Sequence, residues 1–201
     1  MGMRHRHRSQ NRYITAWITQ DEYEASMHRE VMRHSTMLDS GTHLVDPNDV
    51  YVKRIAELIM SMTESEWYRI TAALNFVQSS ISYRDDDRVY GGDFIQAPME
   101  TLYLGGGDCE DTSVLLMSIY LAMGVDAVLL DYKDHTAVGA MYDGGYLFCE
   151  TARDSCRDPV YGLEQDGEYP RIEPYGENGL KTVLNDGIGR LRSIIRYVTG
   201  F

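Results

Sequence analysis

Cysteine and long apolar runs are both scarce in this chain of 201 residues. The cysteines are only three, Cys109, Cys149 and Cys156, and so small and odd a number does not form a disulfide scaffold. It favours a reducing compartment, with a Cys149–Cys156 bond as the less favoured alternative. No apolar stretch reaches the roughly 18 residues of a membrane-spanning helix. The first residues also lack the apolar centre of a signal peptide. We therefore expect a cytoplasmic protein without a membrane span.

Positive charge is also scarce, because 19 lysines and arginines face 31 aspartates and glutamates, which gives a net charge of −12. A nucleic acid or an anionic membrane attracts a positive surface, so neither is predicted as a partner. Basic residues gather near the two ends, at residues 4–12 and 190–196. We interpret residues 1–18 as a flexible basic leader.

The rest of the chain has the composition of an ordinary folded domain, with 43% hydrophobic and 25% charged residues. Its length suits a single domain with a sizeable core. We predict one domain over residues 19–201. It consists of a helical layer at 19–80, a catalytic core at 81–152, and a loop with a C-terminal helix or edge strand at 153–201.

A glycine-rich bend leads directly into one of the cysteines. Residues 105–107 are all glycine, and Asp108 follows as a candidate N-cap. Asp111, three residues later, completes a pattern similar to a capping box. Cys109 then begins a helix that runs to Met123 and is apolar nearly all round, so it is predicted to be buried. The helix N-terminus would lower the pKa of the thiol and favour the nucleophilic thiolate, although a small buried hydrophobe is the alternative interpretation.

Two further candidates lie on predicted strands after this helix. His135 begins one strand, Glu150 lies near the end of the next, and Asp143-Gly144-Gly145 between them is a strong hairpin signal. Antiparallel pairing across that turn can set His135 beside Glu150. A thiol, a base and a carboxylate that orients the base form the triad of a nucleophilic enzyme. The predicted strands cover residues 125–130, 135–141 and 146–151.

Several short motifs follow one another between residues 81 and 152. They are Glu100-Thr101-Leu102, Gly105-Gly106-Gly107-Asp108-Cys109-Glu110-Asp111, Ala122-Met123-Gly124-Val125, His135-Thr136-Ala137-Val138-Gly139 and Phe148-Cys149-Glu150-Thr151. Together they resemble the transglutaminase-like superfamily, most closely its prokaryotic and archaeal cysteine-peptidase-like members. The resemblance implies an α+β fold with a papain-like core. In such a core the nucleophile helix packs on an antiparallel sheet, here beneath N-terminal helices.

The resemblance also implies an oxyanion hole. Phe94-Ile95-Gln96-Ala97-Pro98 matches a pattern of similar members, which makes the Gln96 side chain one donor and the backbone N–H of Cys109 the other. A loop glutamine that only bonds the backbone is the alternative. The superfamily commonly has aspartate as the third triad member, where this chain has Glu150. Asp131 and Asp134 are therefore rivals for that role.

These residues predict a thiol-dependent acyl-transfer enzyme that forms a thioester at Cys109. A cysteine peptidase or amidase, acting on a peptide bond or carboxamide of a peptide or protein, is the first expectation. A protein-glutamine transglutaminase, or a binding or assembly module without turnover, is the alternative. A redox thiol protein is disfavoured, since no Cys-x-x-Cys motif is present.

No metal site and no cofactor are predicted. The histidines of the first helices, His28, His34 and His43, lack the cysteine or carboxylate spacing of a metal site. Asp85-Asp86-Asp87 resembles the start of a calcium loop, but the glycine and the closing glutamate of an EF-hand are missing. Because some transglutaminase-like proteins use calcium, it stays a minor alternative.

Overall fold

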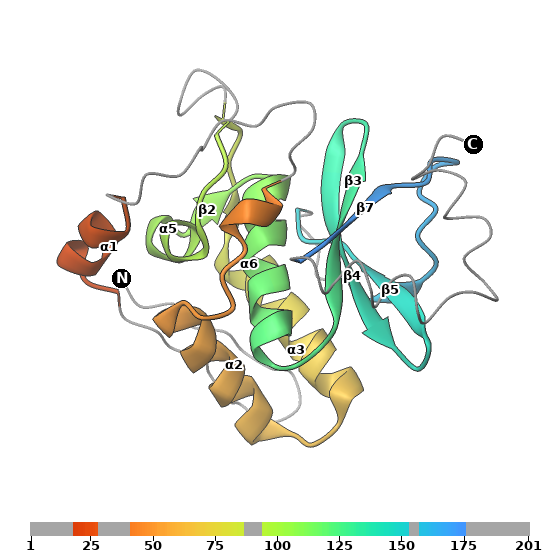
Figure 1. The fold of residues 1–201 in the computed structure, drawn as a ribbon, viewed down its shortest axis with the longest axis horizontal. Helices are drawn as coiled ribbons and strands as arrows, with labels where there is room; N and C mark the ends of the chain where they lie inside the picture. The colour runs from red at the N-terminus through yellow and green to blue at the C-terminus, as the bar shows by residue number, and fades with distance from the viewer. Residues whose placement is uncertain (1–17, 28–40, 87–93, 153–156, 176–201) are drawn as a thin grey trace.

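The computed structural model describes residues 18–27, 41–86, 94–152 and 157–175. Within these ranges the fold is α+β, as the sequence predicted. Helices form one side of the molecule, a twisted antiparallel sheet forms the other, and helix α6 (Cys109–Ala122) lies between them (Figure 1). Residues 1–17 of the predicted leader and the end of the chain from residue 176 lie outside the described residues, so those two predictions stay untested.

The helical side is built mainly from residues before the glycine bend. None of the helices in the described ranges has both the length and the hydrophobicity that a bilayer crossing requires. The cytoplasmic location stays a prediction. The helices besides α6 are α1 (Gln20–Met27), the 3₁₀ turn η1 (Thr42–Leu44), α2 (Val50–Met62), α3 (Glu66–Ser80) and α5 (Pro98–Leu104).

Helix α6 is the central element of the fold. It contacts β3 and β4 of the sheet and also α2, α3 and α5. Apolar side chains on every side of it are fully buried, which explains why the sequence shows no polar face. Burying one such side chain stabilises a fold by about 1.5–3 kcal/mol, so this helix fixes the positions of its neighbours. These side chains include Val114, Leu115, Leu116, Met117 and Ile119.

The sheet has five strands in the order β6-β5-β4-β3-β7, and every neighbouring pair is antiparallel. The turn between β4 and β5 has positive φ at both Asp143 (47°) and Gly144 (76°), as the tight hairpin predicted from the sequence requires. The strands are β3 (Ala127–Tyr132), β4 (His135–Tyr142), β5 (Gly145–Cys149), β6 (Val160–Tyr161) and β7 (Arg171–Pro174).

The glycine bend before α6 serves two different needs. Gly105 ends α5 with a positive φ of 62°, a conformation that glycine adopts without strain. Gly107 lies in β2 (Gly106–Gly107), which pairs in parallel with β1 (Ser82–Tyr83). A Cβ atom on Gly107 would lie 2.5 Å from a carboxylate oxygen of Asp111. The third glycine is therefore required by close packing against α6.

We expect Gly107→Ala to destabilise the protein by about 1–3 kcal/mol, because the new methyl group overlaps the buried Asp111 carboxylate. Gly145→Ala is the matched control, since a Cβ atom there meets only ordinary contacts at 3.7 Å and beyond. Urea unfolding of both variants measures the difference. Equal midpoints for Gly107→Ala and the wild type would show that this approach is not tight.

Candidate active site

Cys109 is the first residue of α6, and its helix start is capped as the sequence predicted. The Asp108 side chain accepts hydrogen bonds from the backbone N–H groups of Glu110 (3.1 Å) and Asp111 (3.4 Å). The Asp111 carboxylate accepts the N–H of Asp108 at 3.3 Å, which completes the reciprocal capping box. Cys109 is thereby placed on a rigid, buried element with only 9% of its surface exposed.

The thiol of Cys109 is bound to a carboxylate. Its Sγ donates to Oε2 of Glu110 at 2.7 Å. Burial raises the pKa of this thiol well above its ordinary value, and the negative charges of Glu110 and Asp108 raise it further. The backbone N–H of Thr136 lowers it, but by less. The prediction of a lowered thiol pKa is therefore wrong, because burial and two carboxyl groups outweigh the effect of the helix N-terminus.

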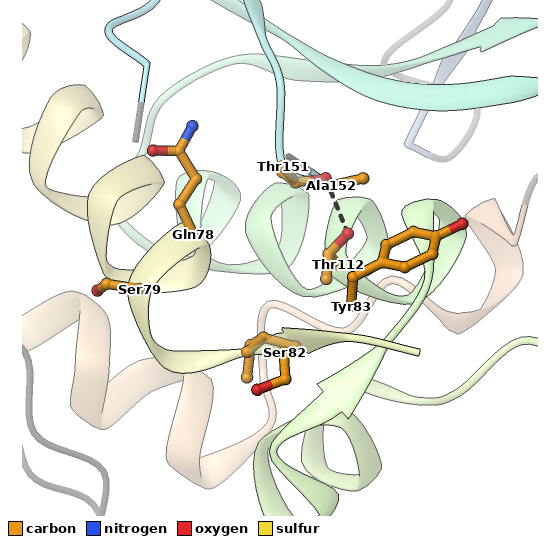
Figure 2. Close-up of a pocket in the computed structure, with 8 residues that line it drawn as sticks. Gln78, Ser79, Ser82, Tyr83, Thr112, Thr151 and Ala152 are labelled. Atoms are coloured by element: carbon orange, nitrogen blue, oxygen red, sulfur yellow. Dashed lines mark hydrogen bonds between the residues drawn. The ribbon is translucent and has the colours of Figure 1, made fainter. Parts of the chain in front are cut away.

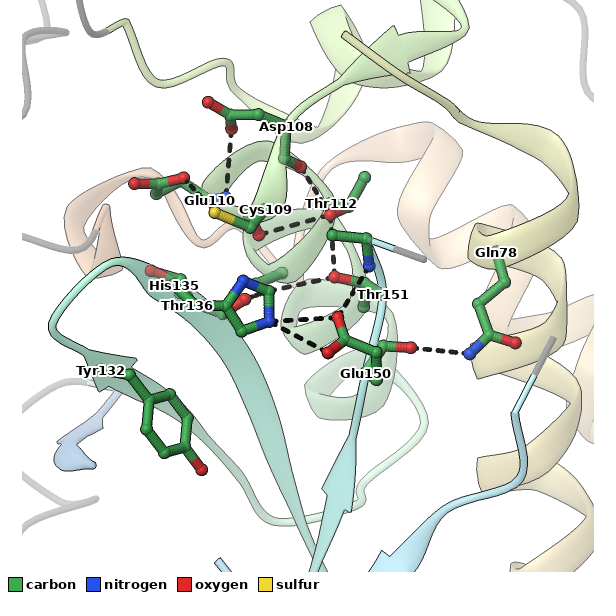
Figure 3. Close-up of polar contacts among 12 residues, drawn as sticks. Gln78, Asp108, Cys109, Glu110, Thr112, Tyr132, His135, Thr136, Glu150 and Thr151 are labelled. Atoms are coloured by element: carbon green, nitrogen blue, oxygen red, sulfur yellow. Dashed lines mark hydrogen bonds and ion pairs between the residues drawn. The ribbon is translucent and has the colours of Figure 1, made fainter. Parts of the chain in front are cut away.

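His135 and Glu150 lie together, as the hairpin predicted. Nε2 of His135 is 3.1 Å from both carboxylate oxygens of Glu150, so the imidazole edge faces the middle of the carboxylate (Figure 3). Glu150 is itself held from two directions. Its Oε1 accepts the N–H of Ala152 at 3.0 Å, and its backbone carbonyl accepts from Nε2 of Gln78 at 2.6 Å. These two contacts hold the buried Glu150 in place.

Cys109 and His135 are neighbours without a direct hydrogen bond in the described part of the chain. The backbone N–H of Thr136, the residue after His135, is close enough to the Cys109 sulfur to lower the pKa of the thiol. The hydroxyl of Ser113 on α6 donates to the Thr136 carbonyl at 3.1 Å, which ties the helix to the start of β4. Figure 3 shows Nδ1 of His135 on the side of the ring toward Cys109, while Nε2 faces Glu150. The thiol proton is nevertheless on the Glu110 side.

Gln96 is buried beside the helix start, but its side chain makes no hydrogen bond to Cys109. Its backbone N–H donates to Oδ1 of Asp111 at 2.6 Å, and its side-chain Oε1 has no partner within the described residues. Asp111 therefore connects the Gln96 loop to α6, a role that sequence reasoning missed. The only sequence signal was its capping position, which says nothing of a loop 15 residues earlier.

An acidic cluster surrounds the start of α6. Burial raises the pKa of Asp111 to about 8, against the two N–H groups that favour its charged form, and Asp86 adds repulsion. Burial also raises the pKa of Asp108, and the neighbouring acidic groups Glu110, Asp111 and Asp86 raise it further. Asp86, part of the aspartate run that suggested calcium, is buried and accepts the N–H of Phe94 at 2.7 Å.

Asp108, Cys109 and Glu110 could each offer one ligand atom to a metal, and these atoms lie within 4.8 Å of one another. Calcium takes about six to eight oxygen ligands, whereas a thiol suits softer metals. One Asp108 oxygen already accepts two helix N–H groups. This mixed set of two carboxylates and a thiol does not by itself make a calcium site. Asp87 lies outside the described residues, and both the metal-free expectation and the calcium alternative stay untested.

Comparisons with known proteins find distant similarity in structure alone. No protein family and no curated protein matches the sequence. Among solved structures, a "Putative Cysteine Protease" of Cytophaga hutchinsonii has 13% identity and a TM-score of 0.43, over 66% of this chain and 50% of that one. LapG of Legionella pneumophila, EGTA-treated, has 14% identity and a TM-score of 0.44, over 71% and 81%. A protein described as a TGase has 14% identity and a TM-score of 0.40, over 79% and 41%.

The chain spans half of the Cytophaga protein and less than half of the TGase. Because every TM-score is below 0.5, we take neither activity nor substrate from these proteins. The functional case rests on the geometry of Cys109, His135 and Glu150.

We expect Glu110→Gln to lower the pKa of the Cys109 thiol, because it removes the charge that accepts the thiol proton at 2.7 Å. Alkylation by iodoacetamide at pH 8 should become about three to ten times faster, since one pKa unit changes the thiolate fraction tenfold. Mass spectrometry of the Cys109 peptide measures the rate. Cys149 is an internal control, because it is fully buried and its pKa is raised to about 12. An unchanged Cys109 rate would show that Glu110 does not hold the thiol.

Proposed function

We propose that this protein is a thiol-dependent acyl-transfer enzyme, a cysteine peptidase or amidase that acts on peptides or proteins. The observation that carries the proposal is the imidazole of His135. One of its nitrogens lies 3.1 Å from both oxygens of the buried Glu150, and the other lies on the side of Cys109 at the start of a buried helix. Nucleophile, base and orienting carboxylate come from α6, β4 and the residue after β5.

In the proposed reaction the thiol first exchanges its hydrogen bond to Glu110 for one to Nδ1 of His135. The imidazole takes the proton, and the sulfur attacks the carbonyl carbon of the substrate. The C–N bond breaks as the imidazolium returns the proton to the leaving amine, which leaves a thioester. Water, deprotonated by His135, then attacks the thioester carbonyl and releases the acid, while Cys109 recovers its proton.

Glu150 has a defined task in this scheme. Its carboxylate accepts the Nε2 proton of His135, which leaves Nδ1 with the lone pair that must take the thiol proton. The surroundings of the two rivals support this choice. Asp131 accepts from Arg171 at 2.8 Å, and Asp134 has 85% of its side chain exposed beside Lys133. A mobile, solvated carboxylate orients an imidazole poorly.

The oxyanion of the tetrahedral intermediate requires hydrogen-bond donors. We assign this role to the backbone N–H of Cys109 and the side-chain amide of Gln96. The bond from the Gln96 backbone to Asp111 supports the assignment, because it ties the Gln96 loop to the helix that carries the sulfur. The Gln96 Oε1 has no hydrogen-bond partner within the described residues. No hydrogen bond there therefore holds the side-chain amide in an orientation that points its oxygen, instead of its NH₂ group, toward the site.

A second candidate is a binding or assembly module with the same fold and no turnover. One observation favours it: the thiol donates its hydrogen bond to Glu110 rather than to His135. A transglutaminase would use the same three residues and differ only in the attacking group, an amine instead of water. Hydrolysis is preferred here, since a transferase must exclude water from the thioester.

The triad predicts a specific pattern of losses. We expect Cys109→Ala to lower peptide cleavage by at least about 10³-fold and Glu150→Gln by about 10²- to 10⁴-fold. Asp134→Asn is the matched control, because this carboxylate adjoins His135 in sequence but is solvent-exposed. New peptide ends released from a mixed peptide library, counted by mass spectrometry, give the rates.

Two outcomes would contradict the triad. Cleavage that survives Cys109→Ala would show that another group is the nucleophile or that a contaminant is active. Equal losses from Asp134→Asn and Glu150→Gln would show that carboxylates near His135 act only through general charge. Added methylamine separates the reaction classes, because an acyl transferase incorporates it into the peptide, whereas a hydrolase incorporates oxygen from water.

A further inference from the structure

A cavity of about 320 Å³ lies immediately beside the proposed triad. Its walls come from the end of α3, from β1, from the first turn of α6 and from the residues after β5 (Figure 2). Thr112 lies three residues after Cys109, and Thr151 directly follows Glu150. This volume is at the low end of small-molecule pockets, about 300–1,000 Å³, and has room for one side chain and its backbone.

The hydroxyl groups of Thr112 and Thr151 meet at this cavity, 2.8 Å apart (Figure 2). The Thr112 hydroxyl donates its proton to the carbonyl of Asp108 at 2.7 Å. The proton in the Thr112–Thr151 contact must therefore come from Thr151. Ser113 lies 3.3 Å from Thr151 but donates to the Thr136 carbonyl at 3.1 Å. The Thr151 oxygen thus keeps its lone pairs for a donor that enters the cavity.

Among the residues that the structure describes, the cavity lining carries no aspartate, glutamate, lysine, arginine or histidine. This is unusual for a site that adjoins Asp108, Glu110 and Glu150. Most lining residues carry uncharged polar groups, and Ile81 and Ala152 are the apolar ones. Burial raises the pKa of Tyr83, and neighbouring acidic groups, Asp108 among them, raise it further, so its phenol stays neutral. The surrounding carboxylates disfavour an anion in this space.

We propose that this cavity is the subsite for an uncharged side chain that carries a hydrogen-bond donor, such as asparagine, serine or threonine, next to the scissile bond. The inference rests on the proposed function, since it places this residue of the substrate beside Cys109. Thr151 accepts from the side chain in this arrangement. An aspartate of the same shape is rejected, because it offers no donor at neutral pH and is repelled by the Glu150 carboxylate.

Three side chains of nearly equal shape test this subsite: asparagine, leucine and aspartate. The N-acetyl methylamides of these amino acids are titrated into the Cys109→Ala protein and followed by NMR. We expect the asparagine compound to bind about fivefold more tightly than the leucine one, and at least about tenfold more tightly than the aspartate one. The same order is expected in cleavage of peptides that vary at the residues flanking the cut.

Thr151→Val, made in the Cys109→Ala background, should bring the asparagine-to-leucine ratio close to one, because it removes the acceptor but keeps the shape. Thr71→Val is the matched control, since the Thr71 hydroxyl donates to the Trp67 carbonyl inside α3, away from the cavity lining. Should Thr151→Val fail to fold, Ala152→Leu fills the cavity and should weaken binding of the asparagine compound about tenfold.

The outcomes separate this inference from the proposed function. A binding preference for asparagine without cleavage of any peptide would retain the subsite and overturn the enzyme. Cleavage with no preference among the three side chains, or an asparagine preference that survives both Thr151→Val and Ala152→Leu, would overturn the subsite and retain the enzyme. Tighter binding of the aspartate compound would also overturn it.

Discussion

The contact between the start of α6 and the start of β4 is the constraint on which the candidate site depends. Cys109 and His135 belong to different elements, so their relative position is set by packing and not by chain connectivity. Ser113 donates to the Thr136 carbonyl at this junction, and the buried apolar side chains of α6 fix the helix against β3 and β4. Without this packing the sulfur and the imidazole would have no defined relation.

A competition for one proton follows from the acidic surroundings of the helix start. Glu110 accepts the thiol proton in the structure, whereas the proposed chemistry needs His135 to take it. Glu110 is within hydrogen-bond distance of the sulfur, and Nδ1 of His135 lies on the side of its ring toward Cys109, so the proposed chemistry requires the thiol to turn from Glu110 to His135. In the structure the thiol donates to Glu110, so the proposed nucleophile would form only when His135 accepts the proton.

Local sequence signals predicted the elements of the site well. Asp108 and Asp111 as caps, the Asp143-Gly144 turn and the pairing of His135 with Glu150 are all encoded within a few residues or across one hairpin. The sign of the thiol pKa shift could not be predicted in the same way. It depends on burial by other elements and on the side-chain direction of Glu110, which a sequence pattern does not carry.

Contacts between segments that are far apart in the chain could not be predicted from the sequence either. The bond from the Gln96 backbone to Asp111 and the meeting of Thr112 with Thr151 arise only once α6 is packed. Which nitrogen of the His135 ring meets Glu150 could not be predicted either, because it depends on where the chain places Glu150 directly after β5. Thr112 and Thr151 read as ordinary polar residues in the chain, although they form one wall of the cavity beside the triad.

The most direct test of the central claim is the rate at which iodoacetamide alkylates Cys109 at pH 7 in the wild type and in His135→Ala. If His135 takes the thiol proton, its removal should slow alkylation by at least about tenfold, while the buried Cys149 stays unreactive in both proteins. Equal alkylation rates in the two proteins would mean that the imidazole does not activate the sulfur, and would contradict the account.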